Sequence, residues 1–196
     1  MIFLKKHARV SIIKDNIKKG DRIPASSKDC DVGQWADQQM IAKGHHLDPN
    51  GVVDLPEYGI DNKTRKQGSN AHHTIGSMTI QGIVDTPSWE NTRFYKKSLN
   101  QNQIQWSEVF QEVVDVTILD MDLPEIQSPL KVAYENLRDK LVNGDRSKTI
   151  KSDCGWAVFD GYNHSNSYRF RITNKAMSKI KNMSRSRDTR KRLFEE

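Results

Sequence analysis

The segment "GVVDLPEYGIDNKTRK", residues 51–66, brings two carboxylates and one amine together around two short apolar runs. Asp61 and Lys63 are two residues apart, so in a β-strand both side chains project from the same face. A neighbouring strand that carries Asp54 would place a second carboxylate alongside. Two carboxylates that converge repel each other unless a cation lies between them, and Mg²⁺ is usually held by one or two carboxylates together with water. The spacing therefore predicts a Mg²⁺ site with Asp54 and Asp61 as ligands, which Mn²⁺ would also occupy because it prefers the same oxygen donors.

A lysine beside such a metal site could act on a bound water molecule. Lys63 would orient the water or help to remove its proton, and the resulting hydroxide would attack a phosphodiester. The pattern thus indicates metal-dependent phosphodiester hydrolysis. The structural alternative is a surface ion pair between Asp61 and Lys63 on an edge strand, and a match to this spacing arises by chance in about one chain in ten of this length.

The charge of the chain points to an anionic partner. Its 196 residues carry a formal net charge of +6, which favours nucleic acid. From Lys175 onward, eight Lys or Arg side chains stand against three acids, so most of the excess lies in the C-terminal tail. Lys181 and Arg185 of this tail are candidate phosphate contacts, and the alternative is a solvated helix. Arg93 and Lys97 belong to a second basic cluster, either a DNA-facing surface or a solvated helix face.

The elements that must position these residues follow from the hydrophobic periodicity and the turn residues. The expected helices are 31–44, 89–99, 128–144 and 174 onward, and the expected strands are 8–13, 51–55, 58–64, 73–84, 109–121, 155–162 and 167–173. Asp31 and Ser128 are the expected helix caps, and Gly44 and Gly144 are the expected stops. Strands and helices alternate, so the sequence predicts an α/β fold with a mixed sheet.

The cysteines and the apolar runs bear on the cellular compartment. Cys30 and Cys154 lie far apart and form no metal-binding or redox pair, which favours buried thiols in a reducing cytoplasm. No apolar run approaches the length that a membrane-spanning helix needs, so no membrane partner is expected.

The segment "DLPEYGIDNKT" resembles the MutH-type branch of the PD-(D/E)-x-K nuclease superfamily, which contains a mismatch-repair nicking endonuclease and related restriction enzymes. That branch has Asp, six residues, Glu, any residue, Lys and Thr, with a Gly two residues before the Glu. Asp54, Gly59, Lys63 and Thr64 keep this register. Asp61 stands where the branch usually has Glu, so a metal would have to lie closer to the strand.

Flanking segments extend the resemblance. "DVGQWAD" is similar to the active-site helix of the branch, in which a Gly precedes an acidic residue by four positions, as Gly33 precedes Asp37. "PSWENTRFYKK" is similar to a segment whose functional Lys lies eight residues beyond a Trp, as Lys97 lies beyond Trp89. The resemblance implies that Asp37 supports a second metal or the site lysine, and that Lys97 contacts the DNA near the scissile phosphate.

The later part of the chain resembles the branch up to Met177. "SYRFRIT" is similar to a strand that carries a DNA-contacting Arg, which matches Arg171, with Arg169 as the alternative. After Met177 the basic tail has no counterpart, so coupling to mismatch repair is not implied.

The resemblance implies a restriction-endonuclease-like fold, an α/β domain with a central mixed β-sheet flanked by helices. It divides the chain into a basic N-terminal segment, residues 1–27, an endonuclease domain, residues 28–177, and a basic C-terminal helix, residues 178–196. The implied function is that of a type II restriction enzyme, a Mg²⁺-dependent endonuclease that cuts double-stranded DNA and leaves 5′-phosphates. Cutting both strands needs a homodimer or two successive nicks. The alternatives are a strand-nicking repair endonuclease and a non-catalytic basic DNA-binding protein.

Overall fold

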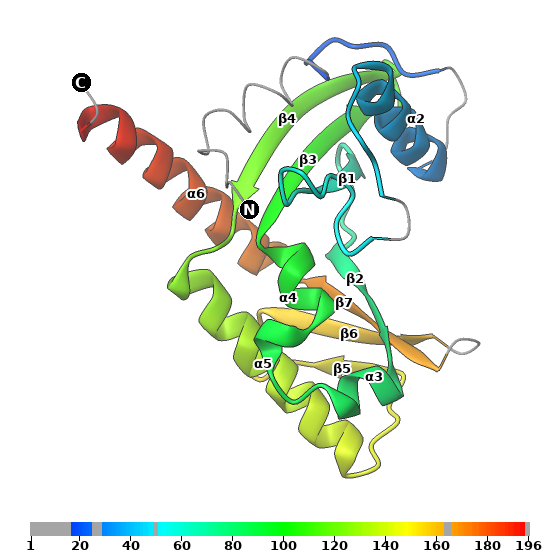
Figure 1. Ribbon diagram of the computed structural model, residues 1–196, viewed down its shortest axis with the longest axis vertical. Coiled ribbons are helices and arrows are strands. Elements are labelled where there is room, and N and C mark those ends of the chain that lie inside the picture. Colours follow the sequence, from blue (N-terminus) through cyan, green and yellow to red (C-terminus); the bar gives the residue numbers. More distant parts are fainter. Residues whose placement is uncertain (1–16, 25–28, 49–50, 163–165, 195–196) are drawn as a thin grey trace. The chain divides into compact units, whose positions relative to one another are not determined.

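A computed structural model describes residues 17–24, 29–48, 51–162 and 166–194 (Figure 1). The fold is mixed α/β, with two sheets flanked by helices, so the expected fold class is confirmed. The described strands form a three-stranded and a four-stranded sheet rather than one central sheet. The restriction-endonuclease-like arrangement and the domain boundaries at residues 28 and 177 stay predictions.

The chain forms two compact units. Unit 1 holds the chain up to Ser69 together with Leu99–Leu119, and unit 2 holds Asn70–Ser98 and the chain from Asp120 onward. The elements of unit 1 are α2 (Asp29–Ala42), β1 (Asp61–Lys66), β3 (Asn100–Ser107) and β4 (Glu112–Asp120). The sheet of unit 1 has the order β1-β3-β4, and β1 is parallel to β3.

Helix α2 packs on one face of β1. Val32, Ala36 and Met40 recur every four residues, and all three side chains are fully buried in the core of unit 1. The helix begins at Asp29, so Asp31 lies inside its first turn and the expected cap is wrong. The expected stop is confirmed, because Gly44 adopts a φ of +85°, a conformation that other residues rarely reach.

The segment before β1 is a turn and not a strand. Residues 51–54 form a bend, and Leu55 and Ile60 pair with each other through two backbone hydrogen bonds of 2.9 and 3.2 Å. Between them Gly59 has a φ of +62°. The expected strand over residues 51–55 is therefore wrong, because the tight turn around Pro56 leaves only one residue on each side to pair.

Strand β3 was not expected, and it is the central strand of its sheet. Its first four residues are Asn or Gln at positions 100–103, which carry no strand signal in a sequence. The stretch at residues 109–121, expected to be a central strand, forms β4, an outer strand of the three described strands in this sheet, and residues 20–22 bond to its beginning. The polar residues of the central strand are buried all the same: Gln101 and Asn102 are fully buried.

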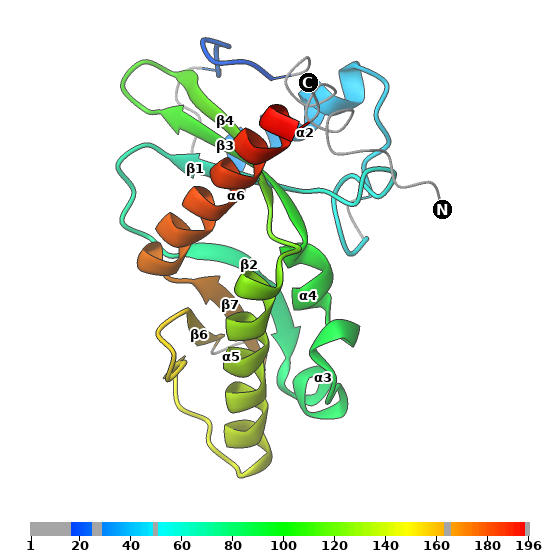
Figure 2. The same cartoon turned by 90° about the vertical axis from the view of Figure 1, so that its left-hand side faces the viewer.

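Unit 2 is built on an antiparallel sheet with the strand order β2-β7-β6-β5. Its elements are β2 (His73–Thr79), α3 (Ile80–Asp85), η1 (Trp89–Asn91), α4 (Arg93–Ser98), α5 (Pro124–Val142), β5 (Thr149–Lys151), β6 (Ala157–Tyr162), β7 (Ser167–Ile172) and α6 (Asn174–Phe194). Figure 2 shows α3, α4 and α5 beside this sheet. Strands β6 and β7 and the closing helix confirm the expectations for these segments.

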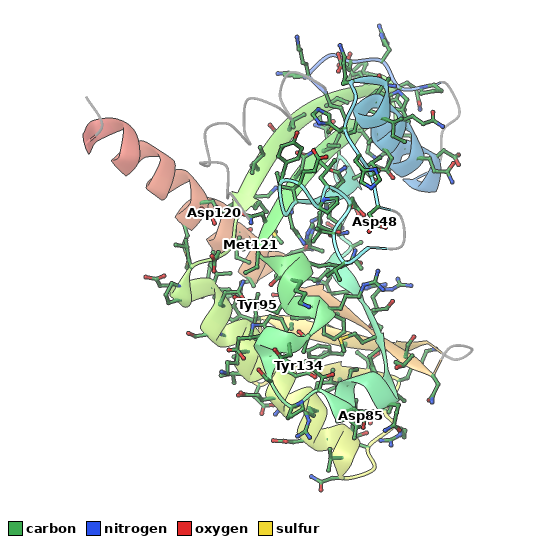
Figure 3. The ribbon with its side chains drawn as sticks, in the orientation of Figure 1. Asp48, Asp85, Tyr95, Asp120, Met121 and Tyr134 are labelled. Carbon is green, nitrogen blue, oxygen red and sulfur yellow. The ribbon has the colours of Figure 1, made fainter. Side chains whose placement is uncertain are left out.

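Aromatic side chains fill the space between the sheet and the helices of unit 2. Phe170 lies at the centre of this core, with ring centroids 4.8 Å from Phe159, 5.2 Å from Phe94 and 5.9 Å from Trp89. The buried Tyr134 hydroxyl lies near the carbonyls of residues 83 and 86, at 3.1 and 2.5 Å (Figure 3). Burial raises the pKa of Tyr134 to about 12, so the hydroxyl stays protonated and can donate.

Two expectations about the ends of elements in unit 2 are wrong. The strand expected over residues 73–84 ends at Thr79, whose hydroxyl accepts a hydrogen bond from the Gly82 amide at 3.0 Å and so caps α3. The helix expected from Ser128 begins one turn earlier at Pro124, so Pro129 lies inside α5. Gly144, with a φ of +86°, follows the helix end as expected.

The remaining expectations concern the cysteines, the membrane and the N-terminal strand. Cys154 is exposed, so the expected burial of this thiol is wrong. The Cys30 side chain and the strand expected at residues 8–13 lie outside the described residues. In the part of the chain that the structure describes, no helix combines the length and the apolarity that crossing a bilayer requires.

Candidate active site

Asp61 and Lys63 lie at the beginning of β1 and face the same side of the strand, as the sequence predicts. Their side chains form an ion pair, and the Asp61 side chain is completely buried while Lys63 is 21% exposed. A buried carboxylate needs a partner, because an isolated charge in the protein interior is strongly unfavourable. Lys63 supplies that partner and remains accessible to solvent.

Asp54 reaches the same strand from the preceding bend. Its Oδ2 accepts a hydrogen bond from the Asn62 backbone amide at 2.8 Å. Among the described strands β1 lies at an edge of its sheet, so this carboxylate occupies a place where a further strand could pair. The carboxylate therefore lies beside Asn62, the residue after Asp61, and a bend positions it rather than the neighbouring strand that the sequence predicted. The same bend is tied to Asp48, whose backbone amide donates to the Asp54 carbonyl at 3.1 Å (Figure 3).

Asp37 approaches β1 from the helix that covers it. A Cβ on Gly33 would lie 3.8 Å from the Thr64 hydroxyl, so α2 passes close to the strand there. Four helix residues advance about 6 Å, and two strand residues advance about 6.6 Å. Asp37 lies one turn after Gly33, and the side chain that lowers its pKa belongs to Asn62, two residues before Thr64. The spacing of Gly33 and Asp37 matches the distance between two positions on β1.

The pKa of Asp37 reports the charges that surround it. Burial raises this pKa above its ordinary value, and the negative charge of Asp54 raises it further. The Asn62 side-chain amide and the Lys63 ammonium lower it, and the Asp61 carboxylate adds a smaller rise. The charges of Asp54, Lys63 and Asp61 thus all act on Asp37, in this order of decreasing effect.

The raised pKa of Asp37 predicts how stability depends on pH. A carboxyl whose pKa is higher in the folded state destabilises the fold where it is ionised, and the fold regains stability as the pH falls through the raised pKa. We expect Asp37→Asn to raise the melting temperature of metal-free protein at pH 7.5. The gain should be at most about 4 °C, because 1 kcal/mol moves the midpoint by roughly 2–4 °C in a chain of this size.

Melting curves of both proteins between pH 4.5 and 7.5, recorded with a chelator, test this expectation. The difference between wild type and Asp37→Asn should shrink towards the acidic end. Asp139→Asn, at an exposed position on α5, is the control and should leave the curve unchanged. A melting temperature of Asp37→Asn below that of wild type at pH 7.5 would contradict the conclusion that the ionised Asp37 carboxylate destabilises the fold.

Polar residues of β3 line up with the site, and the sequence did not single them out. Gln101 is the register partner of Asp61, Asn102 that of Asn62, and Gln103 that of Lys63. The amide of Asn102 donates to Asn62 Oδ1 at 3.2 Å, and Asn102 is fully buried. No described residue donates to Asn102 Oδ1, although that atom is buried. Pairing with the neighbouring strands, and not its own residue composition, makes β3 a strand. Its sequence therefore lacks the alternation of apolar and polar residues that predicts a strand.

The donor chemistry of the site fits a hydrated Mg²⁺ ion. Within the described ranges no three His, Cys, Asp or Glu side chains are gathered closely enough to form a complete metal site. Mg²⁺ does not need three, since it keeps several waters and takes one or two carboxylates. Asp54 and Asp61 would hold it, and the cation would relieve the repulsion that raises the pKa of Asp37.

The other candidate residues lie in unit 2 and are described by themselves. Arg93 is exposed at the start of α4. The Lys97 side chain lies against Gly76 of β2, where an added Cβ would come within 3.2 Å of the Lys97 Cδ. Arg171 forms an ion pair with Asp160 on the neighbouring strand, with 3.0 Å between Nε and Oδ2. The predicted roles of these residues in DNA binding stay predictions.

The C-terminal candidates lie on α6, which ends at Phe194. Lys181 is half-buried on this helix. The side chain of Arg185 lies outside the described residues. Arg169, the alternative to Arg171, is the register partner of Asp160 in the pairing of β6 with β7. Arg169, Arg171 and Asp160 therefore lie on the same face of the sheet.

Comparison with known proteins leaves the family of the chain open. No protein-family model matches the sequence, and no curated protein matches it either.

Proposed function

We propose that this protein is a Mg²⁺-dependent endonuclease that hydrolyses double-stranded DNA. The observation that carries the proposal is that Asp54 is hydrogen-bonded to the Asn62 backbone, between Asp61 and Lys63 of the ion pair, within one compact unit that also contains Asp37. These are the residue types that metal-assisted phosphodiester hydrolysis needs, namely oxygen ligands and an amine that stays close to them. The net charge of +6 supports a polyanionic substrate.

Asp54, Asp61 and Lys63 would have separate roles in the reaction. Bound Mg²⁺ would supply a Lewis acid and lower the pKa of a coordinated water. Asp54 and Asp61 would hold it, with Asp54 fixed by the Asn62 amide. Lys63, which is partly exposed, would orient the attacking water and stabilise the negative charge that develops on the phosphate oxygens. The water oxygen bonds to phosphorus as the bond to the 3′ oxygen breaks, which leaves a 5′-phosphate and a 3′-hydroxyl.

Site-specific cutting of both strands, as by a type II restriction enzyme, is the form of the activity that we propose. The resemblance of "DLPEYGIDNKT" and its flanking segments to the MutH-type nucleases supports this choice. A single unit 1 contains one such site, so a double-strand break requires a homodimer or two successive nicks. The basic tail after Met177 departs from the mismatch-repair enzymes of that branch, which favours restriction over strand-specific repair.

A plasmid cleavage assay tests the proposal. Unmethylated plasmid and phage DNA of varied sequence are incubated with the protein and Mg²⁺ or Mn²⁺. We expect wild type to cut, and Asp54→Asn to lose at least about a hundredfold in rate, because it removes a charged metal ligand. Asp115→Asn is the matched control, since this half-buried acid lies on β4 of the same unit and accepts a hydrogen bond from Thr117.

The products separate the competing functions. Linear plasmid supports double-strand cleavage, and circles that are nicked but never become linear indicate a strand-nicking enzyme. DNA binding measured in Ca²⁺ should be the same for wild type and Asp54→Asn. Binding without any cutting, on all substrates and with either metal, would replace the nuclease proposal by a non-catalytic DNA-binding protein.

A further inference from the structure

The buried asparagine pair between β1 and β3 lies behind the candidate active site. Asn62 and Asn102 are register partners, and they are 8% and 0% exposed. They face the side of the sheet that α2 covers, together with the fully buried Ile60 and Ile104. Apolar side chains at these positions would need no hydrogen-bond partners. Packing in the core therefore does not explain why two amide side chains are buried here.

Asn62 contacts one of the site acids directly. Its backbone amide donates to Asp54 Oδ2 at 2.8 Å, whereas its buried side-chain Nδ2 donates to no described residue. The remaining polar atom of the side chain, Oδ1, is an acceptor, so a hydrogen bond at Oδ1 is what can hold this residue in place. Asn102 makes that interaction, because its Nδ2 donates to Asn62 Oδ1 at 3.2 Å.

We propose that Asn102 is a positioning residue of the candidate active site: by holding Asn62 Oδ1, it keeps the Asn62 backbone amide aligned with Asp54. Asn102 itself touches neither acid in any described contact. This inference rests on the proposed function, because it gives the asparagine pair the role of supporting a metal site. Groups that orient metal ligands from behind typically contribute 10–100-fold to metal affinity or activity.

The buried Oδ1 of Asn102 supports a functional rather than a structural role. No described residue donates to it. A buried acceptor without a donor lowers stability, and such groups in native proteins call for an explanation other than packing. The amide is retained because its other end, Nδ2, serves Asn62.

Mn²⁺ binding to the full-length protein tests the inference, measured by the loss of free-ion signal in electron paramagnetic resonance. We expect Asn102→Leu, which keeps the branching of the side chain but makes no hydrogen bond, to weaken Mn²⁺ binding about tenfold or more. Gln105→Leu is the matched control, because Gln105 lies on the same strand opposite Arg65 and outside the site. It should bind Mn²⁺ as wild type does.

A second measurement needs no metal. In chelator-treated protein, hydrogen exchange of the Asn62 amide should be faster in Asn102→Leu than in wild type, since the contact with Asp54 is no longer held. Thermal melting shows whether the variant folds. If it does not, Asn102→Thr replaces it, because its hydroxyl is too short to reach Asn62 Oδ1 and its volume is close to that of asparagine.

The outcomes separate this inference from the nuclease proposal. Wild-type Mn²⁺ affinity and unchanged Asn62 exchange in a folded Asn102 variant would overturn the positioning role alone. Weakened Mn²⁺ binding in the variant, together with a wild type that never cuts DNA, would overturn the nuclease proposal alone. A wild type that binds no Mn²⁺ would overturn both.

Discussion

We expect Lys63→Met to slow DNA cleavage strongly and also to destabilise unit 1, and the combination of the two effects is diagnostic of a lysine that serves both the site and the fold. We expect the cleavage rate to fall by about 10²–10⁴-fold, the usual contribution of a positioned group that acts on the attacking water. The free energy of unfolding should fall by about 3 kcal/mol, because the fully buried Asp61 loses its ion pair with Lys63. Plasmid cleavage and urea denaturation measure the two effects.

Lys66→Met is the matched control for this prediction. Lys66 lies on the same strand and pairs with Glu108, but their side chains are 39% and 58% exposed. An exposed pair contributes at most about 1 kcal/mol, so this variant should stay nearly as stable as wild type and should cut DNA.

The double variant Asp61→Asn with Lys63→Met separates a structural from a catalytic ion pair. Removing both charges should restore most of the stability that Lys63→Met loses, because the buried carboxylate that lost its ion pair is then neutral. Cleavage should stay absent. A stable double variant that cuts DNA at the wild-type rate would show that the pair serves the fold only.

Phe170→Ala should lower the free energy of unfolding of unit 2 by about 3–5 kcal/mol. The Phe170 ring is fully buried and contacts Phe94, Phe159 and Trp89, so its removal leaves a cavity at the centre of the aromatic core. Urea denaturation followed by tryptophan fluorescence and by circular dichroism measures the change.

Phe110→Ala is the control for the core prediction. Phe110 lies in the turn between β3 and β4 and is 62% exposed, so its truncation should change the stability by less than about 0.5 kcal/mol. Equal and small effects of the two substitutions would contradict the packing of the β7 core.

Much of the fold could be predicted from local patterns in the sequence. The α5 face that carries Leu130, Ala133, Leu137 and Leu141 is fully buried or nearly so, as its helical spacing indicates. The strands β6 and β7 also lie where alternation and a turn between them indicate. Asp61 and Lys63 share a face because the two-residue period of a strand leaves no other arrangement.

The rest depended on contacts between distant segments. β3 is a strand because β1 and β4 pair with it on either side, although Asn and Gln are poor strand formers. Asp54 reaches the site through a turn whose geometry is set by the pairing of Leu55 and Ile60. The expected caps at Asp31 and Ser128 failed because each helix begins before the residue that would cap it.

The parallel pairing of β1 with β3 has a consequence for how the protein folds. These adjacent strands are separated along the chain by β2, α3, η1 and α4, which belong to unit 2. A ribosome releases all three acids and the lysine of the candidate site long before it releases Gln101 and Asn102, so the nascent chain holds these side chains without the strand that orders them. The long loop closure makes this pairing entropically costly and slow, and we expect the candidate site to be among the last parts of unit 1 to form.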